Sequence, residues 1–161
     1  MLVKVRQITN IFATIFVFLV VLLAILNFSS DPKRSSLFGY RGYTVISGSM
    51  APTLQVGDYL VVKETPFHQL TKKAVISFQN KETIVTHRIV EQTSDGSLIT
   101  RGDANSVDDL LLVTERAYLG QMFFRIPFLG YLMIWLQNPL FFSVILAFVA
   151  VRFVYLWLVK K

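Results

Sequence analysis

The chain has no cysteine and only two histidines among its 161 residues. The absence of cysteine excludes a thiol nucleophile, a cysteine-ligated metal and any disulfide, so no covalent cross-link stabilises a domain of this chain. His68 and His87 are far apart in the sequence and no HExxH spacing is present, which gives little support for a zinc site. We therefore expect neither a metal nor another cofactor.

Charged residues are absent from residues 7–30 and from residues 126–151. Hydrophobic residues make up 53% of the chain and the mean hydropathy is +0.54, which is too apolar for an ordinary soluble domain of this length. The run from Ile8 to Phe28 has the roughly 20 residues that a hydrocarbon core about 30 Å thick requires. A cleaved export signal is the alternative interpretation, but the run is longer than the usual apolar stretch of such a signal.

The second apolar region runs from about Ile126 to Val151 and contains Gln137, Asn138 and Pro139. It is either one kinked segment, or an interfacial piece over residues 123–136 followed by a span over residues 140–158. We expect four parts: a tail and transmembrane helix (1–30), a linker (31–42), an extracytoplasmic domain (43–125), and a transmembrane region with a basic tail (126–161).

The tails carry only basic charge, whereas all 10 acidic residues lie within residues 30–125. Basic flanks remain in the cytoplasm, so two crossings predict a multi-pass protein of the cell membrane, with both termini cytoplasmic and the central domain outside. Residues 30–125 hold 11 basic and 10 acidic side chains, so no basic patch indicates binding to nucleic acid.

Six short β-branched runs separated by turn residues predict strands in the central domain. The fold class expected is mainly β, a barrel or a sandwich between two transmembrane helices. The predicted strands cover residues 43–47, 58–64, 74–79, 83–91, 97–102 and 117–124.

Three segments carry residue types suited to catalysis. Ser47-Gly48-Ser49 lies in a turn between two predicted strands, where Gly48 allows close backbone approach and strained angles; an ordinary Ser/Gly turn is the alternative. Strand alternation places His87 on a half-apolar face together with Val85 and Ile89, although a lone strand histidine is more often structural than catalytic.

The acidic loop Arg101–Asp109 contains three carboxylates, Asp103, Asp108 and Asp109. One of them would orient His87 and stabilise its cation, whereas a solvated or calcium-binding loop is the alternative. A serine hydroxyl needs a base to remove its proton as it attacks. Ser49, His87 and an aspartate supply that set, and the Ser49 N–H with the Ser47 hydroxyl would form an oxyanion hole.

The ordered segments SGSMAPTL, VTHRIV and TRGDANSVDD resemble the conserved boxes of signal peptidase I across residues 43–125. The histidine at position 87, where the common bacterial enzymes have a lysine, resembles the endoplasmic reticulum, archaeal and Gram-positive type. The resemblance implies that Ser49 is the nucleophile and His87 the general base. It also implies that Asp109 is the carboxylate partner and Asp103 a supporting acidic residue.

The same resemblance implies a membrane-bound serine endopeptidase that removes signal peptides from exported preproteins, with small side chains at the first and third positions before the cut. The substrates are either exported preproteins in general or a dedicated set such as pilin subunits. A catalytically silent relative that assists assembly of pilin or matrix subunits is the alternative. A self-cleaving or regulatory serine protease of related fold is a third possibility. The sequence names neither the substrates nor any accessory subunit.

Overall fold

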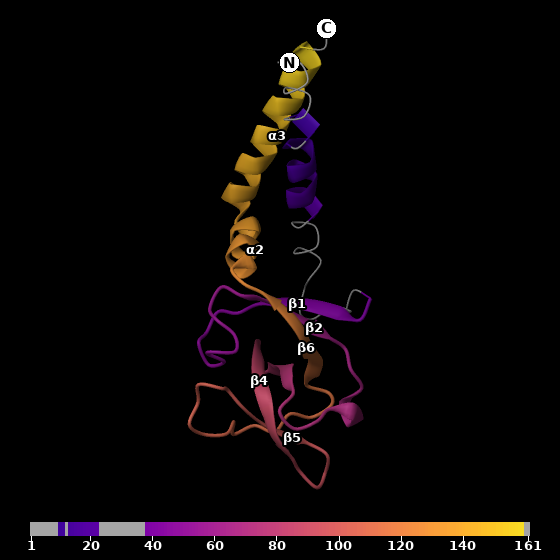
Figure 1. Ribbon diagram of the computed structural model, residues 1–161, viewed down its shortest axis with the longest axis vertical. Helices are drawn as coiled ribbons and strands as arrows, with labels where there is room; N and C mark the ends of the chain where they lie inside the picture. The colour runs from indigo at the N-terminus through magenta and orange to yellow at the C-terminus, as the bar shows by residue number, and fades with distance from the viewer. Residues whose placement is uncertain (1–9, 12, 23–37, 160–161) are drawn as a thin grey trace. The chain divides into compact units, whose positions relative to one another are not determined.

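The computed structural model describes residues 10–11, 13–22 and 38–159. The chain divides into two compact units, one formed by residues 30–132 and the other by residues 1–29 with 133–161. The first unit contains the β-strands (Figure 1). The candidate catalytic residues belong to this unit.

The first unit is a single six-stranded sheet, which confirms the predicted number of strands and the mainly β class. The order across the sheet is β1-β2-β6-β3-β4-β5, and all neighbouring strands are antiparallel. A short 3-10 helix, η1 (Phe67–Gln69), follows β2. The strands are β1 (Tyr40–Thr44), β2 (Tyr59–Lys63), β3 (Val75–Asn80), β4 (Thr83–Gln92), β5 (Leu98–Arg101) and β6 (Tyr118–Ile126).

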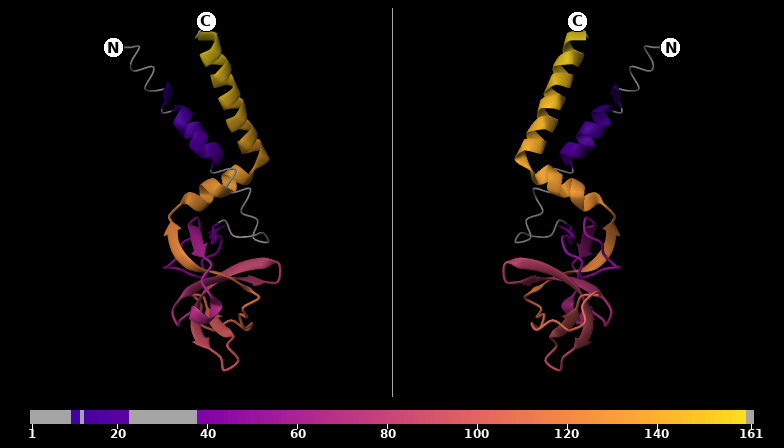
Figure 2. Two further views of the ribbon diagram at one scale, coloured as in Figure 1. Left: turned by 90° about the vertical axis from the view of Figure 1, so that its right-hand side faces the viewer. Right: turned by 90° about the vertical axis from the view of Figure 1, so that its left-hand side faces the viewer.

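The structure differs from the predicted barrel or sandwich because all six described strands belong to one twisted sheet (Figure 2). Register shifts in three of the strand pairs let the sheet bend without a second layer. The first strand also begins at Tyr40 and ends at Thr44, so residues 40–42 belong to the sheet and not to the linker. Residues 31–37 of that linker lie outside the described residues.

Two hydrophobic clusters pack on opposite faces of the sheet. Val75 belongs to one and the adjacent Ile76 to the other, and consecutive strand residues point to opposite faces. Consistently, the first four residues of β3 are all buried. The first cluster contains Leu70, Ile76, Phe78, Ile89, Leu98 and Val113. The second contains Met50, Leu54, Leu60, Val62 and Val75.

The chain leaves the sheet through helix α2 (Leu129–Gln137) and helix α3 (Pro139–Val159). Asn138 separates the two helices and caps the second one, since its side-chain oxygen accepts the Leu140 N–H at 2.9 Å. Pro139 occupies the first position of α3, where no backbone N–H is needed. Of the two arrangements expected for this region, the break into two parts is observed, as a short helix followed by a long apolar one, whereas residues 123–126 of the expected interfacial piece belong to β6.

Within the described residues, one helix is long and apolar enough to cross a membrane, Pro139–Leu156, with a mean hydropathy of 2.2. Near the other end of the chain, Ala13–Leu22 is a shorter apolar helix. The remainder of the predicted span Ile8–Phe28 includes residues outside the described part of the chain.

An ion pair between a buried carboxylate, Asp58, and a partly exposed guanidinium, Arg125, joins the start of β2 to the end of β6. Asp58 is only 2% exposed, and its Oδ2 accepts hydrogen bonds from the Gln55 N–H at 2.9 Å and from Arg125 Nη1 at 2.6 Å. Burial alone would raise the pKa of Asp58, but the Gln55 N–H and the Arg125 guanidinium outweigh it, so the pKa is lowered.

This lowered pKa predicts a stability effect that depends on pH. A carboxylate with a folded pKa below the unfolded value, about 3.9, stabilises the fold above that value and loses the effect as pH falls through the folded pKa. Asp58→Asn should therefore lower the free energy of unfolding by about 2 kcal/mol at pH 7, with the difference from wild type shrinking below about pH 4. Thermal unfolding of the full chain in detergent measures this, with the exposed Glu115→Gln as control. An equal difference at pH 7 and pH 3 would contradict it.

Candidate active site

Ser49 lies in a tight turn between β1 and β2 whose neighbouring side chains are buried. Met50 is 2% exposed and Leu54 is fully buried, and the Leu54 N–H donates to the Met50 carbonyl at 2.9 Å. Because both apolar side chains are packed in the second cluster, the backbone directly after the half-buried Ser49 is fixed.

The expected role of Gly48 is wrong. Its φ is not positive, and a Cβ built on it would meet nothing within 4 Å. The close approach occurs instead at Gly102, where a Cβ would lie 2.5 Å from the Ser49 carbonyl oxygen. A glycine is therefore required at position 102, opposite the turn that carries Ser49, and not at position 48.

His87 lies in the middle of β4, with its ring packed edge-on against Phe78 at a centroid distance of 6.4 Å. The predicted alternation is confirmed, since His87 and Ile89 are both buried. The Nε2 atom lies 3.2 Å from Ser49 Oγ, within hydrogen-bonding distance. The structure thus brings together two side chains that are 38 positions apart in the sequence.

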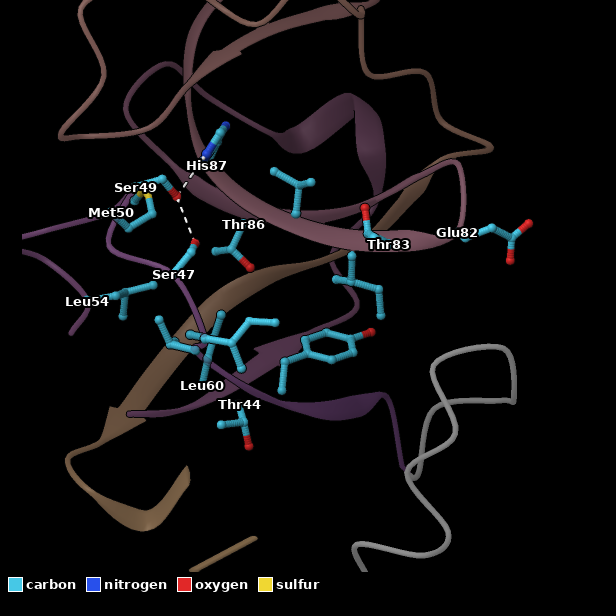
Figure 3. A pocket seen from close by; sticks show the side chains of 15 residues that line it. Thr44, Ser47, Ser49, Met50, Leu54, Leu60, Glu82, Thr83, Thr86 and His87 are labelled. Atoms are coloured by element: carbon cyan, nitrogen blue, oxygen red, sulfur yellow. Dashed lines mark hydrogen bonds between the residues drawn. The ribbon is translucent and has the colours of Figure 1, made fainter. Parts of the chain in front are cut away.

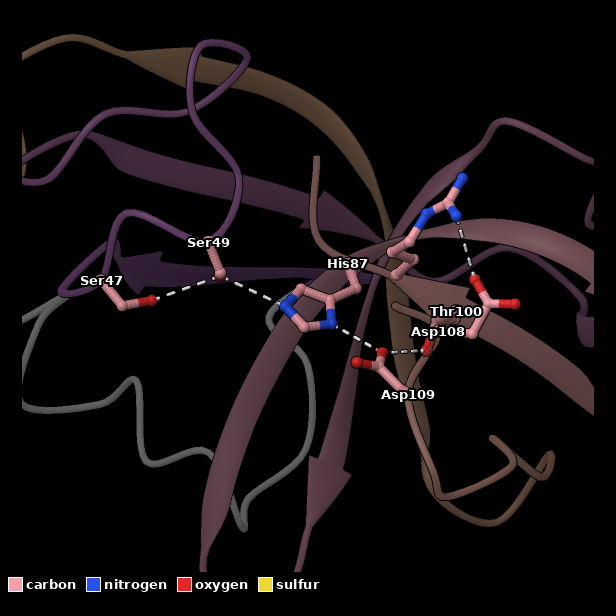
Figure 4. Close-up of polar contacts among 7 residues, drawn as sticks. Ser47, Ser49, His87, Thr100, Asp108 and Asp109 are labelled. Carbon is pink, nitrogen blue, oxygen red and sulfur yellow. Dashed lines mark hydrogen bonds and ion pairs between the residues drawn. The ribbon is translucent and has the colours of Figure 1, made fainter. Parts of the chain in front are cut away.

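Asp109 completes the chain of contacts on the other side of the imidazole (Figure 4). Its Oδ2 lies 2.6 Å from His87 Nδ1 and also accepts the Thr100 hydroxyl at 2.6 Å. An ionised carboxylate only accepts hydrogen bonds, so the proton of a neutral His87 belongs on Nδ1. Nε2 is then an acceptor facing the Ser49 hydroxyl.

The other two carboxylates of the loop face elsewhere. Asp108 is exposed and pairs with Arg101 at 3.4 Å. Asp103 forms a two-point ion pair with Arg88, at 2.7 and 2.6 Å, and is not within hydrogen-bonding contact of His87. Arg88 holds the pKa of Asp103 below its ordinary value. The geometry therefore separates Asp109, beside the imidazole, from Asp103, which is part of a neighbouring ion pair.

Ser47 lies close to the candidate nucleophile, with its hydroxyl 3.4 Å from Ser49 Oγ. Within the described part of the chain, the Ser49 backbone N–H donates to no acceptor. Both groups therefore lie beside the Ser49 hydroxyl and are the candidates for an oxyanion hole.

Sequence reasoning missed three polar side chains around these residues: Thr53, Arg88 and Thr100. Each contacts a carboxylate of the acidic loop, Thr53 and Arg88 at Asp103 and Thr100 at Asp109. Arg88 directly follows His87 in the sequence. Its positive charge, opposite to that of the carboxylates in the acidic loop, was the one available signal of a contact with that loop. The two threonines lie in segments where nothing local distinguishes them from ordinary turn or strand residues. His68 is exposed on η1, away from these contacts.

A cavity of about 530 Å³ opens beside Ser49 and His87 (Figure 3). One wall is the segment from Tyr43 to Ser47 and the opposite wall is the segment from Glu82 to His87, while buried apolar side chains form the base. These apolar side chains are Met50, Leu54 and Leu60. Among the described residues, no three His, Asp or Glu side chains gather in a way that would hold a metal ion.

A hydroxyl, an imidazole and a carboxylate in this order are the arrangement that Ser-His-Asp hydrolases use to activate a serine. No family model matches the chain. Signal peptidase I W of Bacillus subtilis is 38% identical over 117 residues, which cover 68% of this chain and 62% of that protein.

The signal peptidase complex catalytic subunit SEC11 is also similar. The protein of Pyricularia oryzae is 34% identical over 110 residues, and that of Saccharomyces cerevisiae is 31% identical over 107 residues. Each alignment covers 58% of this chain, and 62% and 64% of the two relatives. The chain thus spans less than two thirds of the length of these relatives. These similarities support a signal peptidase I family member.

Proposed function

We propose that this chain is a membrane-bound serine endopeptidase that removes signal peptides from exported preproteins. The observation that carries the proposal is the line of contacts from Ser49 Oγ through the His87 ring to Asp109 Oδ2, at 3.2 and 2.6 Å. Relatives named as signal peptidases support the same reaction class.

In the proposed reaction, His87 Nε2 accepts the Ser49 proton as Ser49 Oγ attacks the scissile carbonyl carbon. Asp109 holds the imidazole through Nδ1 and stabilises its cation, with Thr100 fixing the carboxylate. The Ser49 N–H and the Ser47 hydroxyl stabilise the developing oxyanion. His87 then returns the proton to the leaving amine, and water releases the acyl group by the same route in reverse.

The cavity suits a peptide in extended conformation. Val45 uses its N–H and carbonyl in bonds to Asp58 and Gly57, so the backbone groups of Thr44 and Ile46 face the opposite edge of the segment. Across the cavity, residues 83–87 of β4 are not paired by β5, which begins its pairing at Arg88. A peptide strand placed between these two edges would gain backbone hydrogen bonds on both sides.

This placement gives a physical reason for selecting small side chains. In an extended peptide the first and third residues before the cut point to the same side. On that side they would meet the closely packed base formed by Met50, Leu54 and Leu60, which are at most 2% exposed. Large side chains at these two positions would not fit without displacing the core.

The membrane arrangement belongs to the same proposal. We place α3 across the membrane as one span and the N-terminal apolar segment as the other, with both termini cytoplasmic and the catalytic domain outside. A preprotein held by its own apolar leader then diffuses in the same two dimensions as the enzyme, which removes part of the entropic cost of encounter. Pilin subunits are included among the proposed substrates.

The test is cleavage of a preprotein by the full chain reconstituted in liposomes. We expect one cut, after a residue preceded by small side chains at the first and third positions, identified by mass spectrometry of the released product. A preprotein with Ala→Phe at the first position before the cut is the control and should remain intact. If no preprotein is cleaved, the alternative of a catalytically silent relative that assists pilin or matrix-subunit assembly is favoured.

Activity should depend on pH because a protonated imidazole cannot accept the Ser49 proton. We expect the cleavage rate to fall steadily between about pH 8 and pH 5, where imidazoles titrate. The carboxylates Asp58 and Asp103 have lowered pKa values, so their stabilising contribution is lost only at more acidic pH, below about 4. Circular dichroism at each pH separates the two effects, and a flat rate over this range with an intact fold would exclude histidine as the base.

A further inference from the structure

The turn that carries Ser49 is held against a second loop, residues 102–105. The Ala104 N–H donates to the Ser49 carbonyl at 2.9 Å, and Gly102 leaves no room for a side chain beside the same oxygen. The backbone of the candidate nucleophile therefore rests directly on the loop that follows β5. Any shift of that loop would move the backbone that carries Ser49 Oγ.

Thr53 provides the side-chain link between the two segments. Its hydroxyl donates to Asp103 Oδ2 at 2.5 Å and accepts a hydrogen bond from Arg88 Nη2 at 3.2 Å. Thr53 lies four residues after Ser49 in the same turn. One hydroxyl thus connects the nucleophile turn to both members of the Arg88–Asp103 ion pair.

The ion pair is itself rigidly held. Arg88 binds both Asp103 oxygens, and its third nitrogen, Nη1, donates to the Lys73 carbonyl at 2.7 Å. The side chains of Arg88 and Asp103 are 32% and 16% exposed, so water competes only partly for these bonds. Two-point ion pairs of this kind fix orientation as well as distance. Arg88 also follows His87 directly in β4, so the network ties the nucleophile turn to the strand of the base.

We propose that Thr53 is a positioning residue that sets the distance between Ser49 Oγ and His87 Nε2, a role that rests on the proposed function. Thr53 does not line the cavity and contacts neither His87 nor Asp109. Its effect therefore falls on the geometry of attack and not on substrate binding. Reaction rates are sensitive to such geometry, since a misplacement of about 1 Å can cost roughly 100-fold.

The test compares Thr53→Val, which keeps the shape and removes the hydroxyl, with Thr53→Ser, which keeps the hydroxyl. In the full chain in liposomes, we expect Thr53→Val to lower kcat roughly 10-fold or more with KM within about two-fold, and Thr53→Ser to restore most of kcat. Thr93→Val is the matched control, because Thr93 also donates to an aspartate, Asp95, but in the β4–β5 turn. It should leave kcat unchanged.

A second measurement does not depend on activity. Hydrogen exchange at the Ala104 amide, which donates to the Ser49 carbonyl, should be faster in Thr53→Val and unchanged in Thr53→Ser and Thr93→Val. If Thr53→Val does not fold, Thr53→Ala and Thr53→Ser, which differ by one oxygen, give the same comparison.

The outcomes separate the two proposals. Wild-type rates and wild-type exchange in Thr53→Val would overturn the positioning role while leaving the peptidase proposal intact. Slower cleavage with a raised KM and unchanged kcat would also overturn it, because that pattern indicates substrate binding. If the wild type cleaves no preprotein, the proposed function fails, and unchanged hydrogen exchange at Ala104 in Thr53→Val would still overturn the positioning role of Thr53.

Discussion

A chain carrying Ser49→Ala should leave a preprotein uncleaved, with a rate at least about 10⁴-fold below that of the wild type. The substitution removes one oxygen, the atom that lies 3.2 Å from His87 Nε2 and 3.4 Å from the Ser47 hydroxyl. Without it no acyl intermediate forms, and neither neighbour can replace it. Gel analysis of a labelled preprotein in liposomes measures the loss.

The fold should tolerate this change, because Ser49 is only half-buried and the turn is fixed by Met50 and Leu54. Its unfolding free energy should stay within about 0.5 kcal/mol of wild type. Ser94→Ala, an exposed serine in the β4–β5 turn, is the matched control and should cleave normally. Wild-type cleavage by Ser49→Ala would remove the serine mechanism altogether.

His87→Gln should cause a comparable loss, and the double variant should be no slower than either single one. The losses caused by substituting residues that act as one unit do not add. Without the base the hydroxyl is not activated, and without the hydroxyl the base has no proton to accept. Additive losses would indicate that Ser49 and His87 act in separate steps.

Local patterns predicted much of the sheet but not its order. β-branched runs and turn residues predicted six strands, and alternation predicted that His87 and Ile89 share a buried face. The position of β6 between β2 and β3 was not predictable, since it depends on which edges remain free after the local hairpins have formed. Whether the strands form one bent sheet or a sandwich was not predictable for the same reason, because it also depends on how the strand edges pair over long distances in the sequence.

The relation between Ser49 and His87 also required tertiary structure. Ser49 lies in a turn and His87 in a strand, and each segment can be explained locally. The contacts that join them are tertiary: the Ser49 carbonyl accepts the Ala104 N–H at 2.9 Å, and Ser49 Oγ lies 3.2 Å from His87 Nε2. The choice between adjacent Asp108 and Asp109 depended on a backbone contact. The Asp109 N–H donates to the Thr100 carbonyl at 2.8 Å, which turns its side chain toward the imidazole.

Asp109→Asn should lower kcat by roughly 10² to 10⁴-fold while leaving KM nearly unchanged. Asp109 does not line the cavity, so we expect the substitution to have little effect on substrate binding. Both of its short contacts end on Oδ2, where His87 Nδ1 and the Thr100 hydroxyl donate. An asparagine keeps the shape of the side chain but carries no charge, so the imidazolium formed during attack loses its counter-ion.

Asp108→Asn is the matched control for this variant. It removes the same charge one residue away, from a side chain that is 46% exposed and pairs with Arg101 across 3.4 Å. Exposed pairs of this kind contribute little, so kcat should change by less than about two-fold. The ratio of the two losses separates a specific role of the carboxylate beside His87 from a general effect of loop charge. If Asp108→Asn and Asp109→Asn slowed cleavage equally, the contact between Asp109 and the imidazole would not be the source of the effect.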